Sequence, residues 1–257
     1  MLLYRLGPEG FYAATDDAGD MRVVYSDPFQ VDPGEWEMGR VVETGVQGIL
    51  APVHPGKIIG IGRNYRAHAE ELGNPVPDEP VMFLKAPSSV IGPQAAVVLP
   101  PESERVEFEG EIGVVLRRQL CRATPEQARG AILGVTCACD VTARDLQRKD
   151  PCFSRAKSFD TFCPVGPAIL VEPDLEDLEV VTRVNGEERQ RGHTRIMLFQ
   201  ILELLVYASR MMTLEPGDLM LAGTPEGVGP LADGDRLEVD VTGVGVLENT
   251  VEVWRQR

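Results

Sequence analysis

The stretch V-E-F-E-G-E-I-G-V-V-L at residues 106–116 places three glutamates at every second position. Apolar and acidic residues alternate in its first half, and alternation with period two is typical of a β-strand. In a strand, Glu107, Glu109 and Glu111 would all point to one face. We therefore expect one long strand here, with three carboxylates side by side.

Further short apolar runs surround this strand. The tail R-L-E-V-D-V-T-G-V-G-V-L-E-N-T-V-E-V (236–253) alternates around a Gly-containing turn and predicts a β-hairpin. Residues 196–212 repeat apolar side chains at helical spacing and predict the longest helix. Because strands outnumber helices and do not alternate regularly with them, we expect a strand-rich α+β fold rather than a doubly wound βαβ fold. Other strands are expected at 2–6, 21–25, 48–53, 58–61, 81–84 and 132–138, a short helix at 65–72, and a second short helix opened by Thr142 and Asp145 with capping-box spacing.

Two prolines within four residues interrupt the chain at P-V-H-P-G, residues 52–56. Such a stretch is a plausible boundary between domains. The sequence therefore predicts a small N-terminal β domain over residues 1–54 and a catalytic metal-binding domain over residues 55–257.

The composition limits the partners of this 257-residue chain. It has 40 acidic and 25 basic residues, a formal net charge of -15. That charge repels phosphate backbones and anionic lipids, so we expect neither nucleic acid nor a membrane as a partner. An anionic substrate would need local positive charge from a metal or from Lys and Arg. Five cysteines, an odd number without metal-binding spacing, and the lack of a leader pattern predict reduced thiols and a cytoplasmic location.

The acidic strand has two interpretations. It could be a solvated acidic face, or its carboxylates could supply hard oxygen ligands for Mg²⁺, Mn²⁺ or Ca²⁺. Gly110 and Gly113 favour the second, because glycine in a strand often marks a bulge or close approach by a ligand. Asp140, which ends an apolar run, could be a helix cap or a third carboxylate of the same site.

Two further motifs carry candidate catalytic groups. His68 and Glu71 have i, i+3 spacing in G-I-G-R-N-Y-R-A-H-A-E-E-L-G, which could orient the imidazole as a general base or simply form a surface pair. The glycines of this motif lack the third glycine of a dinucleotide-binding fingerprint. Lys157, in R-A-K-S-F-D-T-F-C-P, could stabilise an oxyanion or form a structural ion pair. The segment L-A-G-T-P-E-G-V-G-P is either a turn or a substrate loop.

Taken together, these segments resemble the fumarylacetoacetate hydrolase family. The matching motifs occur in family order: G-R-N-Y-x-x-H-x-x-E from Gly62, F-E-G-E-I-G-V-V from Phe108, D-V-T-A-R-D-L-Q from Asp140, K-S-F-D-T-F-C-P from Lys157, V-N-G-E-E-R-Q from Val184, and L-E-P-G-D through L-A-G-T-P-E-G-V-G from Leu214. They cover nearly all of residues 57–250. One departure is His193, where many members carry Asn.

The resemblance implies a mixed β-roll core of the fumarylacetoacetate hydrolase C-terminal type, a homodimer, and a bound Mg²⁺ or Mn²⁺. The resemblance also implies which residues bind the metal, catalyse the reaction and bind the substrate, and it implies no such role for Glu107. The implied metal ligands are Glu109, Glu111 and Asp140, the implied catalytic residues are His68 and Glu71 on a mobile lid helix together with Lys157, and the implied substrate-binding residues are Arg63, Gln147 and Thr224.

The function implied is that of a divalent-metal-dependent enzyme acting on a small oxo-acid. Hydrolysis of a C–C bond in an acylpyruvate-type substrate is favoured, with decarboxylation or enol–keto isomerisation of a related dicarboxylate, such as 2-hydroxyhepta-2,4-diene-1,7-dioate, as alternatives. A non-catalytic acidic protein that binds Ca²⁺ is the rival from another class. The substrate depends on the loops around residues 72–80, 148–156 and 224–232, whose packing the sequence does not reveal.

Overall fold

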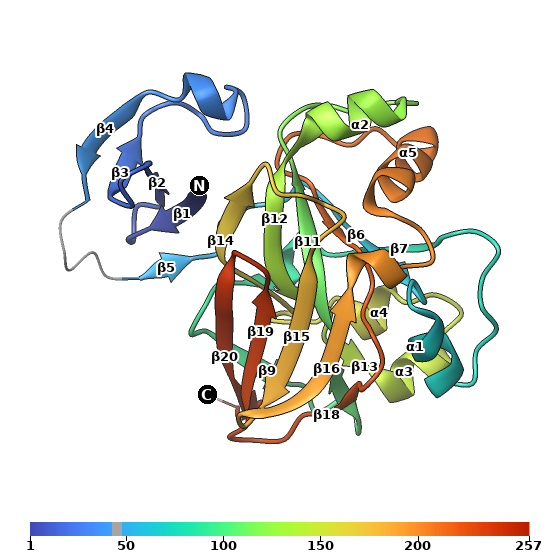
Figure 1. The fold of residues 1–257 in the computed structure, drawn as a ribbon. Helices are drawn as coiled ribbons and strands as arrows, with labels where there is room; N and C mark the ends of the chain where they lie inside the picture. The colour runs from blue at the N-terminus through green and yellow to red at the C-terminus, as the bar shows by residue number, and fades with distance from the viewer. Residues whose placement is uncertain (43–47, 257) are drawn as a thin grey trace.

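The strands of the described chain form three β-sheets. The computed structural model describes residues 1–42 and 48–256. A large sheet of 12 strands runs in the order β4-β3-β2-β1-β14-β12-β11-β17-β6-β7, with β5 paired to β1 and β8 paired to β14. A five-stranded sheet, β16-β15-β19-β20-β9, and a three-stranded sheet, β13-β10-β18, complete the body (Figure 1). The predicted strand-rich α+β fold is therefore confirmed.

Parallel and antiparallel pairs both occur. β17 is parallel to β6, β14 to β8 and β20 to β9, while the other pairs are antiparallel. The large and the five-stranded sheets are therefore mixed, whereas the three-stranded sheet is antiparallel. The strands are β1 (Leu2–Leu6), β2 (Phe11–Thr15), β3 (Met21–Val24), β4 (Met38–Val41), β5 (Ile49–Leu50), β6 (Ile58–Gly62), β7 (Val81–Lys85), β8 (Val90–Ile91), β9 (Ala96–Leu99), β10 (Val106–Phe108), β11 (Gly110–Leu116), β12 (Ile132–Cys139), β13 (Thr142–Ala143), β14 (Cys163–Val171), β15 (Glu179–Val184), β16 (Glu187–His193), β17 (Leu219–Leu221), β18 (Gly229–Pro230), β19 (Arg236–Val241) and β20 (Gly245–Val253).

The helices are short and lie around the edges of the sheets. None of the described helices is long and apolar enough to cross a membrane. The α-helices are α1 (Arg66–Glu71), α2 (Pro125–Ala131), α3 (Arg144–Lys149), α4 (Ser154–Lys157) and α5 (Ile201–Met211), and the 3₁₀ turns are η1 (Pro33–Glu35), η2 (Pro87–Ser89) and η3 (Thr194–Ile196).

The single strand predicted over residues 106–116 is wrong in one respect. The structure divides it at Glu109 into β10, which pairs with β13 and β18, and β11, which pairs with β12 and β17. The two halves thus belong to different sheets. Both the acidic and the apolar residues of the stretch are buried, so the acidic residues do not form a solvated face.

The two glycines of this stretch allow close packing. A Cβ on Gly110 would lie 1.8 Å from Oγ1 of Thr182 on β15, and a Cβ on Gly113 would lie 3.0 Å from Cγ2 of Thr136 on β12. Their physical role is therefore contact between strands and between sheets. The prediction that they mark close approach by a ligand is replaced by this explanation.

Two helix predictions also need correction. The longest helix begins at Ile201 rather than at residue 196, because Gln200 and Glu203 form its capping box and Ile196 lies in η3 with 61% of its surface exposed. Thr142 does not cap a helix. It belongs to β13, and its hydroxyl donates to the backbone carbonyl of Asp140. Asp145, its expected capping partner, instead accepts from Ser103.

The tail hairpin is confirmed. β19 and β20 pair antiparallel from Arg236 opposite Thr250 to Val241 opposite Gly245. The five cysteines are free, and three of them, Cys137, Cys139 and Cys163, are buried. This agrees with the expectation of reduced thiols.

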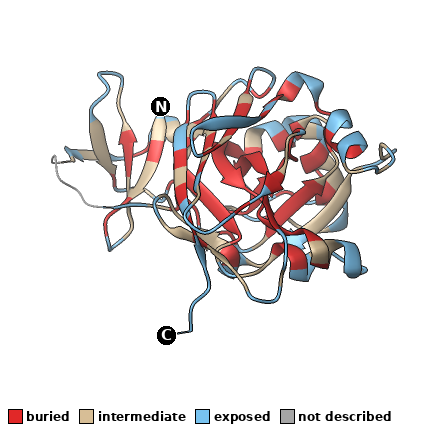
Figure 2. Cartoon of the chain, turned by 90° about the horizontal axis from the view of Figure 1, so that it is seen from below, coloured by how far each residue is buried: buried red, intermediate tan, exposed pale blue. Residues whose placement is uncertain are grey.

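The N-terminal strands extend the large sheet. β1 pairs with β14 through Leu2 opposite Leu170 and Leu3 opposite Ile169. Figure 2 shows fewer buried residues in these N-terminal strands than in the main body. Of the strands predicted there, 48–53 shortens to β5, while β2 and β4 were not predicted. The division into domains at residue 54 stays a prediction, and residues 43–47 of its first part lie outside the described residues.

Candidate active site

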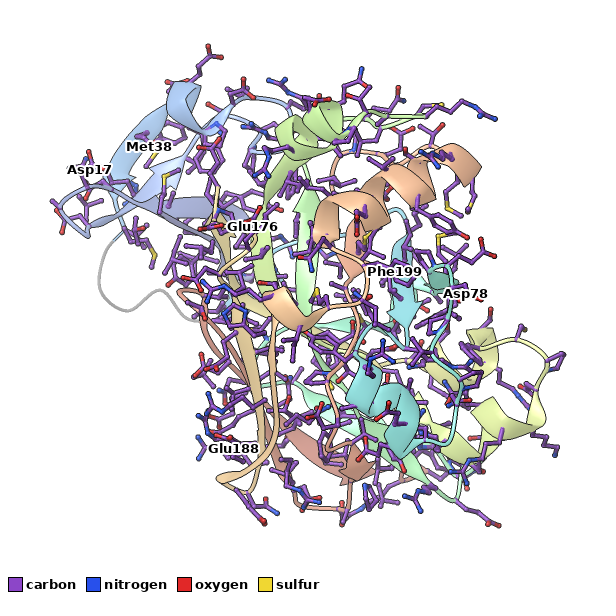
Figure 3. The ribbon with its side chains drawn as sticks, turned by 45° about the vertical axis from the view of Figure 1, so that its right-hand side comes forward. Asp17, Met38, Asp78, Glu176, Glu188 and Phe199 are labelled. Carbon is purple, nitrogen blue, oxygen red and sulfur yellow. The ribbon has the colours of Figure 1, made fainter. Side chains whose placement is uncertain are left out.

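A cavity of ≈ 250 Å³ lies where α1, α3 and α4 meet the strands β6 and β7 and the junction between β10 and β11. Figure 1 places the three helices together at one side of the body, and Figure 3 turns that side forward, with Asp78 labelled on the segment between α1 and β7. Five of the nine predicted site residues line this cavity. The lining residues are Gly62, Arg63, His68, Leu72, Asn74, Phe83, Glu109, Arg144, Gln147, Arg148, Phe153 and Lys157.

Three buried carboxylates meet beside the cavity. Glu109 lies between β10 and β11, Glu111 on β11, and Asp140 directly after β12. One oxygen of each lies within 4.8 Å of the others, so the three could hold a single metal ion. The backbone N–H of Asp140 donates to the carbonyl of Glu109 at 2.8 Å, which fixes the two segments together. Carboxylate oxygens alone suit a hard divalent cation such as Mg²⁺, Mn²⁺ or Ca²⁺.

Two buried lysines neutralise part of this charge. Nζ of Lys157 on α4 lies 2.6 Å from Oε2 of Glu109 and 2.5 Å from Oδ2 of Asp140. Nζ of Lys85, the last residue of β7, lies 2.7 Å from Oδ1 of Asp140. The predicted positive charge at Lys157 is thus beside the carboxylates. The sequence reasoning missed Lys85, although Lys85 is one of only four lysines in the chain.

Arg144 ties the cavity wall to the carboxylates. Its buried guanidinium donates to Glu107 at 2.6 Å, to Gln147 at 2.5 Å, and to Glu109. Arg144 therefore links Glu107 to Glu109, and Glu107 is not one of the three clustered carboxylates. Arg144 itself was missed, although it stands inside the D-V-T-A-R-D-L-Q motif.

Glu111 is the carboxylate of the trio that has no ion-pair partner among the described residues. Its carboxylate accepts the backbone N–H of Gly223 at 2.6 Å, and no ion pair reaches it from the described part of the chain. Burial raises the pKa of Glu111 well above its ordinary value, and the nearby Asp140 and Glu109 raise the pKa further. A divalent cation at the trio would remove this repulsion, so the charge balance fits a metal ion.

We expect Glu111→Gln to abolish metal binding without unfolding the protein. The amide keeps the bond from Gly223 and removes a charge that burial already opposes, so the melting temperature without metal should not fall. The affinity for Mn²⁺ should fall at least about 100-fold, beyond the effect of losing an outer-shell partner. Titration calorimetry with and without chelator measures both quantities. Unchanged Mn²⁺ affinity would show that the ion is not held by these carboxylates.

His68 and Glu71 form the second part of the site. His68 is 4% exposed on α1, and its Nδ1 lies 3.5 Å from Oε2 of Glu71, which is longer than a good hydrogen bond. Glu71 also accepts the backbone N–H of Gly227 at 3.1 Å. Burial lowers the pKa of His68, outweighing the opposite effect of Glu109. A neutral imidazole facing the cavity can accept a proton, as a general base must.

Arg63 and Thr224, both predicted to contact substrate, lie in different places. Arg63 follows β6 with φ +58°, a left-handed conformation unusual for arginine, and lines the cavity. Thr224 does not line it. The Thr224 hydroxyl is buried, donates to the carbonyl of Gly110 and accepts from Gln190. Its role toward a substrate stays a prediction. His193 lies outside the site and pairs with Asp177 at 3.2 Å.

The strand-rich fold and the cluster of three buried carboxylates agree with the resemblance to the fumarylacetoacetate hydrolase family. A comparison with known protein families tests this resemblance directly. Residues 57–252 match the family described as fumarylacetoacetate (FAA) hydrolase C-terminal. The chain belongs to this family of enzymes. The predicted resemblance is therefore confirmed, and the non-catalytic binding protein finds no support.

Individual relatives are similar over most of the chain. An uncharacterised protein of Archaeoglobus fulgidus is 46% identical over 91% of this chain and 94% of its own length. Human mitochondrial oxaloacetate tautomerase is 40% identical over 79% of this chain and 68% of its own. The crystal structure of 5-carboxymethyl-2-hydroxymuconate delta-isomerase from Mycobacterium smegmatis, 39% identical, superposes with a TM-score of 0.89 over 99% of this chain and 100% of that one. Of these three, the two named by an activity are a tautomerase and an isomerase, and another similar structure, 34% identical, is named a fumarylacetoacetate hydrolase.

Proposed function

We propose that the chain catalyses a divalent-metal-dependent enol–keto isomerisation of a small 2-oxo dicarboxylate. The observation that carries the proposal is that His68 is buried and faces the same cavity as Glu109 of the carboxylate trio; burial lowers the pKa of His68, which favours the basic form of the imidazole. Isomerisation needs one base beside a polarised carbonyl and no attacking water. The tautomerase and isomerase relatives favour this choice, and a similar structure named a fumarylacetoacetate hydrolase keeps the C–C hydrolysis expected from the sequence as the second candidate.

The residues divide the reaction between them. Glu109, Glu111 and Asp140 would hold Mg²⁺ or Mn²⁺, which when bound polarises the 2-oxo group as a Lewis acid. In the keto-to-enol direction, His68 takes the proton from the carbon next to that carbonyl and passes it to the enolate oxygen. In the reverse direction, His68 takes the enol O–H proton and delivers it to that carbon. Lys157 adds positive charge where the enolate oxygen forms, and Gln147 can donate its amide N–H groups to the substrate because its carbonyl is held by Arg144.

A substrate panel tests the reaction type. We would assay enol oxaloacetate, acetylpyruvate and fumarylpyruvate with Mg²⁺, Mn²⁺, Ca²⁺ and chelator. Loss of the enol absorbance without carbon dioxide or a cleaved acid, and its arrest by chelator, is the expected result. Release of carbon dioxide would identify a decarboxylase instead.

Acylpyruvate hydrolysis remains the second candidate. The observation in its favour is the carboxylate of Glu71 beside His68, because a His–Glu pair can activate water. Cleavage of acetylpyruvate to pyruvate and acetate at a rate above its tautomerisation would establish this activity in place of the proposed one.

The pH profile provides a separate prediction. Because burial lowers the pKa of His68, the base stays neutral to a lower pH than free histidine, whose pKa is about 6.5. A bound cation would act in the same direction. As the pH is lowered, kcat/KM should therefore begin to fall only below the pKa of free histidine, about 6.5. An acid limb above pH 7 would contradict a neutral His68 as the base.

The remaining expectations concern partners and location. We propose a homodimer that acts on a small oxo-acid, without nucleic acid or membrane partners, in the cytoplasm. The net charge of -15 supports the exclusion of polyanions. Sedimentation of the purified protein tests the dimer.

A further inference from the structure

Helix α3 carries a row of polar side chains along one wall of the cavity. Arg144, Gln147 and Arg148 all line it. Their spacing of i, i+3 and i+4 places them on one helix face, and the rise of about 1.5 Å per residue puts the backbone of Arg148 about 6 Å along the helix from that of Arg144. Arg144 is buried and Arg148 exposed, so the row runs from the carboxylates toward solvent.

The first and last members of this row differ in their partners. Arg144 is fully engaged by Glu107, Glu109 and Gln147. The side chain of Arg148 has neither a hydrogen bond nor an ion pair within residues 1–42 and 48–256. Asp150, the nearest acidic residue in sequence, is held instead by Arg155 at 2.5 Å. The guanidinium of Arg148 is therefore available to a ligand.

The solvent side of the cavity has a positive charge that nothing in the wall balances. Arg63 also lines the cavity and has no ion-pair or hydrogen-bond partner across the described ranges. Glu109 is the only acidic residue of the lining, and it is paired with Lys157 and Arg144. In a chain of net charge -15, two free guanidiniums at one cavity are a specific feature that fits a second anionic group.

We propose that Arg148, together with Arg63, forms a subsite for the distal carboxylate of the substrate and so selects dicarboxylates over monocarboxylates. This inference rests on the proposed function for the position of the 2-oxo-carboxylate end at the metal ligands. Arg148 acts as a specificity-determining residue. It holds the far end of the substrate and takes no part in proton transfer.

A pair of matched ligands tests the subsite without turnover. 2-Oxoglutarate and 5-methyl-2-oxohexanoate share the 2-oxo-carboxylate end and have the same number of heavy atoms, but only the first ends in a carboxylate. Binding to the Mg²⁺-loaded protein is measured by calorimetry. Arg148→Gln should weaken 2-oxoglutarate about tenfold, as loss of a charged hydrogen bond at a partly exposed site would, and change the affinity for the other ligand less than about twofold.

Lys149→Gln is the control, because Lys149 is the next residue on α3, carries the same charge and does not line the cavity. It should change neither affinity, and Arg148→Lys should retain part of the binding. Equal weakening of both ligands by Arg148→Gln, no weakening, or equal effects of the two glutamine variants would overturn the subsite. A selective loss in a protein that turns over no enol substrate would keep the subsite and refute the proposed isomerase. Turnover of enol oxaloacetate together with unselective binding would support the isomerase and refute the subsite.

Discussion

His68→Gln is expected to lower kcat by about 10²–10⁴-fold, the usual contribution of a positioned general base. Glutamine is close to histidine in size and polar, but it cannot accept a proton from carbon at neutral pH. The ligand carboxylates do not contact His68 through any hydrogen bond in the described chain, so the Mn²⁺ affinity should remain within about threefold, well inside the 10–100-fold cost of losing an outer-shell partner. Steady-state kinetics on enol oxaloacetate and metal titration measure the two effects.

His193→Gln is the matched control for this variant. His193 also faces a carboxylate, that of Asp177, but it lies on β16 and does not line the cavity. The control should leave kcat unchanged. Equal turnover in wild type and His68→Gln would exclude His68 as the base in either the isomerase or the hydrolase mechanism, and a parallel loss of Mn²⁺ affinity would show a structural role instead.

The sequence predicted the chemistry of the site better than its geometry. Period-two spacing indicated three carboxylates on one face, and family order selected Glu109 and Glu111 from them. The sequence did not indicate that the strand breaks at Glu109. That break depends on which strands pair with each half, β13 and β18 on one side and β12 and β17 on the other, and such long-range pairing leaves no local periodicity.

The buried cations were hard to predict for a similar reason. Arg144 and Lys85 pair with residues 35 to 55 positions away, and nothing in the residues next to them marks that distance. A usable signal did exist for Lys85. It follows the apolar run V-M-F-L of β7, where an ammonium is normally avoided unless it has a buried partner. Lys157 likewise lies between short apolar stretches, and the structure places it beside the same aspartate.

Lys85→Met should cost about 3–5 kcal/mol of unfolding free energy, the range for removing one partner of a buried ion pair. The Lys85 ammonium is completely buried. It donates to Asp140 at 2.7 Å, to the carbonyl of Phe162 at 3.1 Å and to the carbonyl of Lys157. Methionine fills a similar volume but leaves these three acceptors with one donor fewer each. Urea unfolding in the presence of chelator measures the loss.

Part of that loss should return when Mg²⁺ is added. The cation binds only the folded chain and supplies positive charge to Asp140, so it stabilises the variant by mass action in addition to the charge it restores. The Mg²⁺-induced rise in unfolding free energy should therefore be larger in Lys85→Met than in wild type at equal metal saturation. A rise no larger than in wild type would mean that Lys85 and the ion do not share the charge of Asp140.

Lys57→Met provides the comparison, because Lys57 also forms a lysine–carboxylate pair, at 2.5 Å from Asp218. That lysine is 25% exposed, and Asp218 keeps backbone N–H bonds from residues 57 and 215 when the ammonium is removed. The cost should stay near 1 kcal/mol or below, as for other partly solvated pairs. It should also be insensitive to Mg²⁺. If both variants lose the same stability, burial of Lys85 contributes nothing specific, and the assignment of Lys85 as the residue that holds Asp140 in place would be wrong.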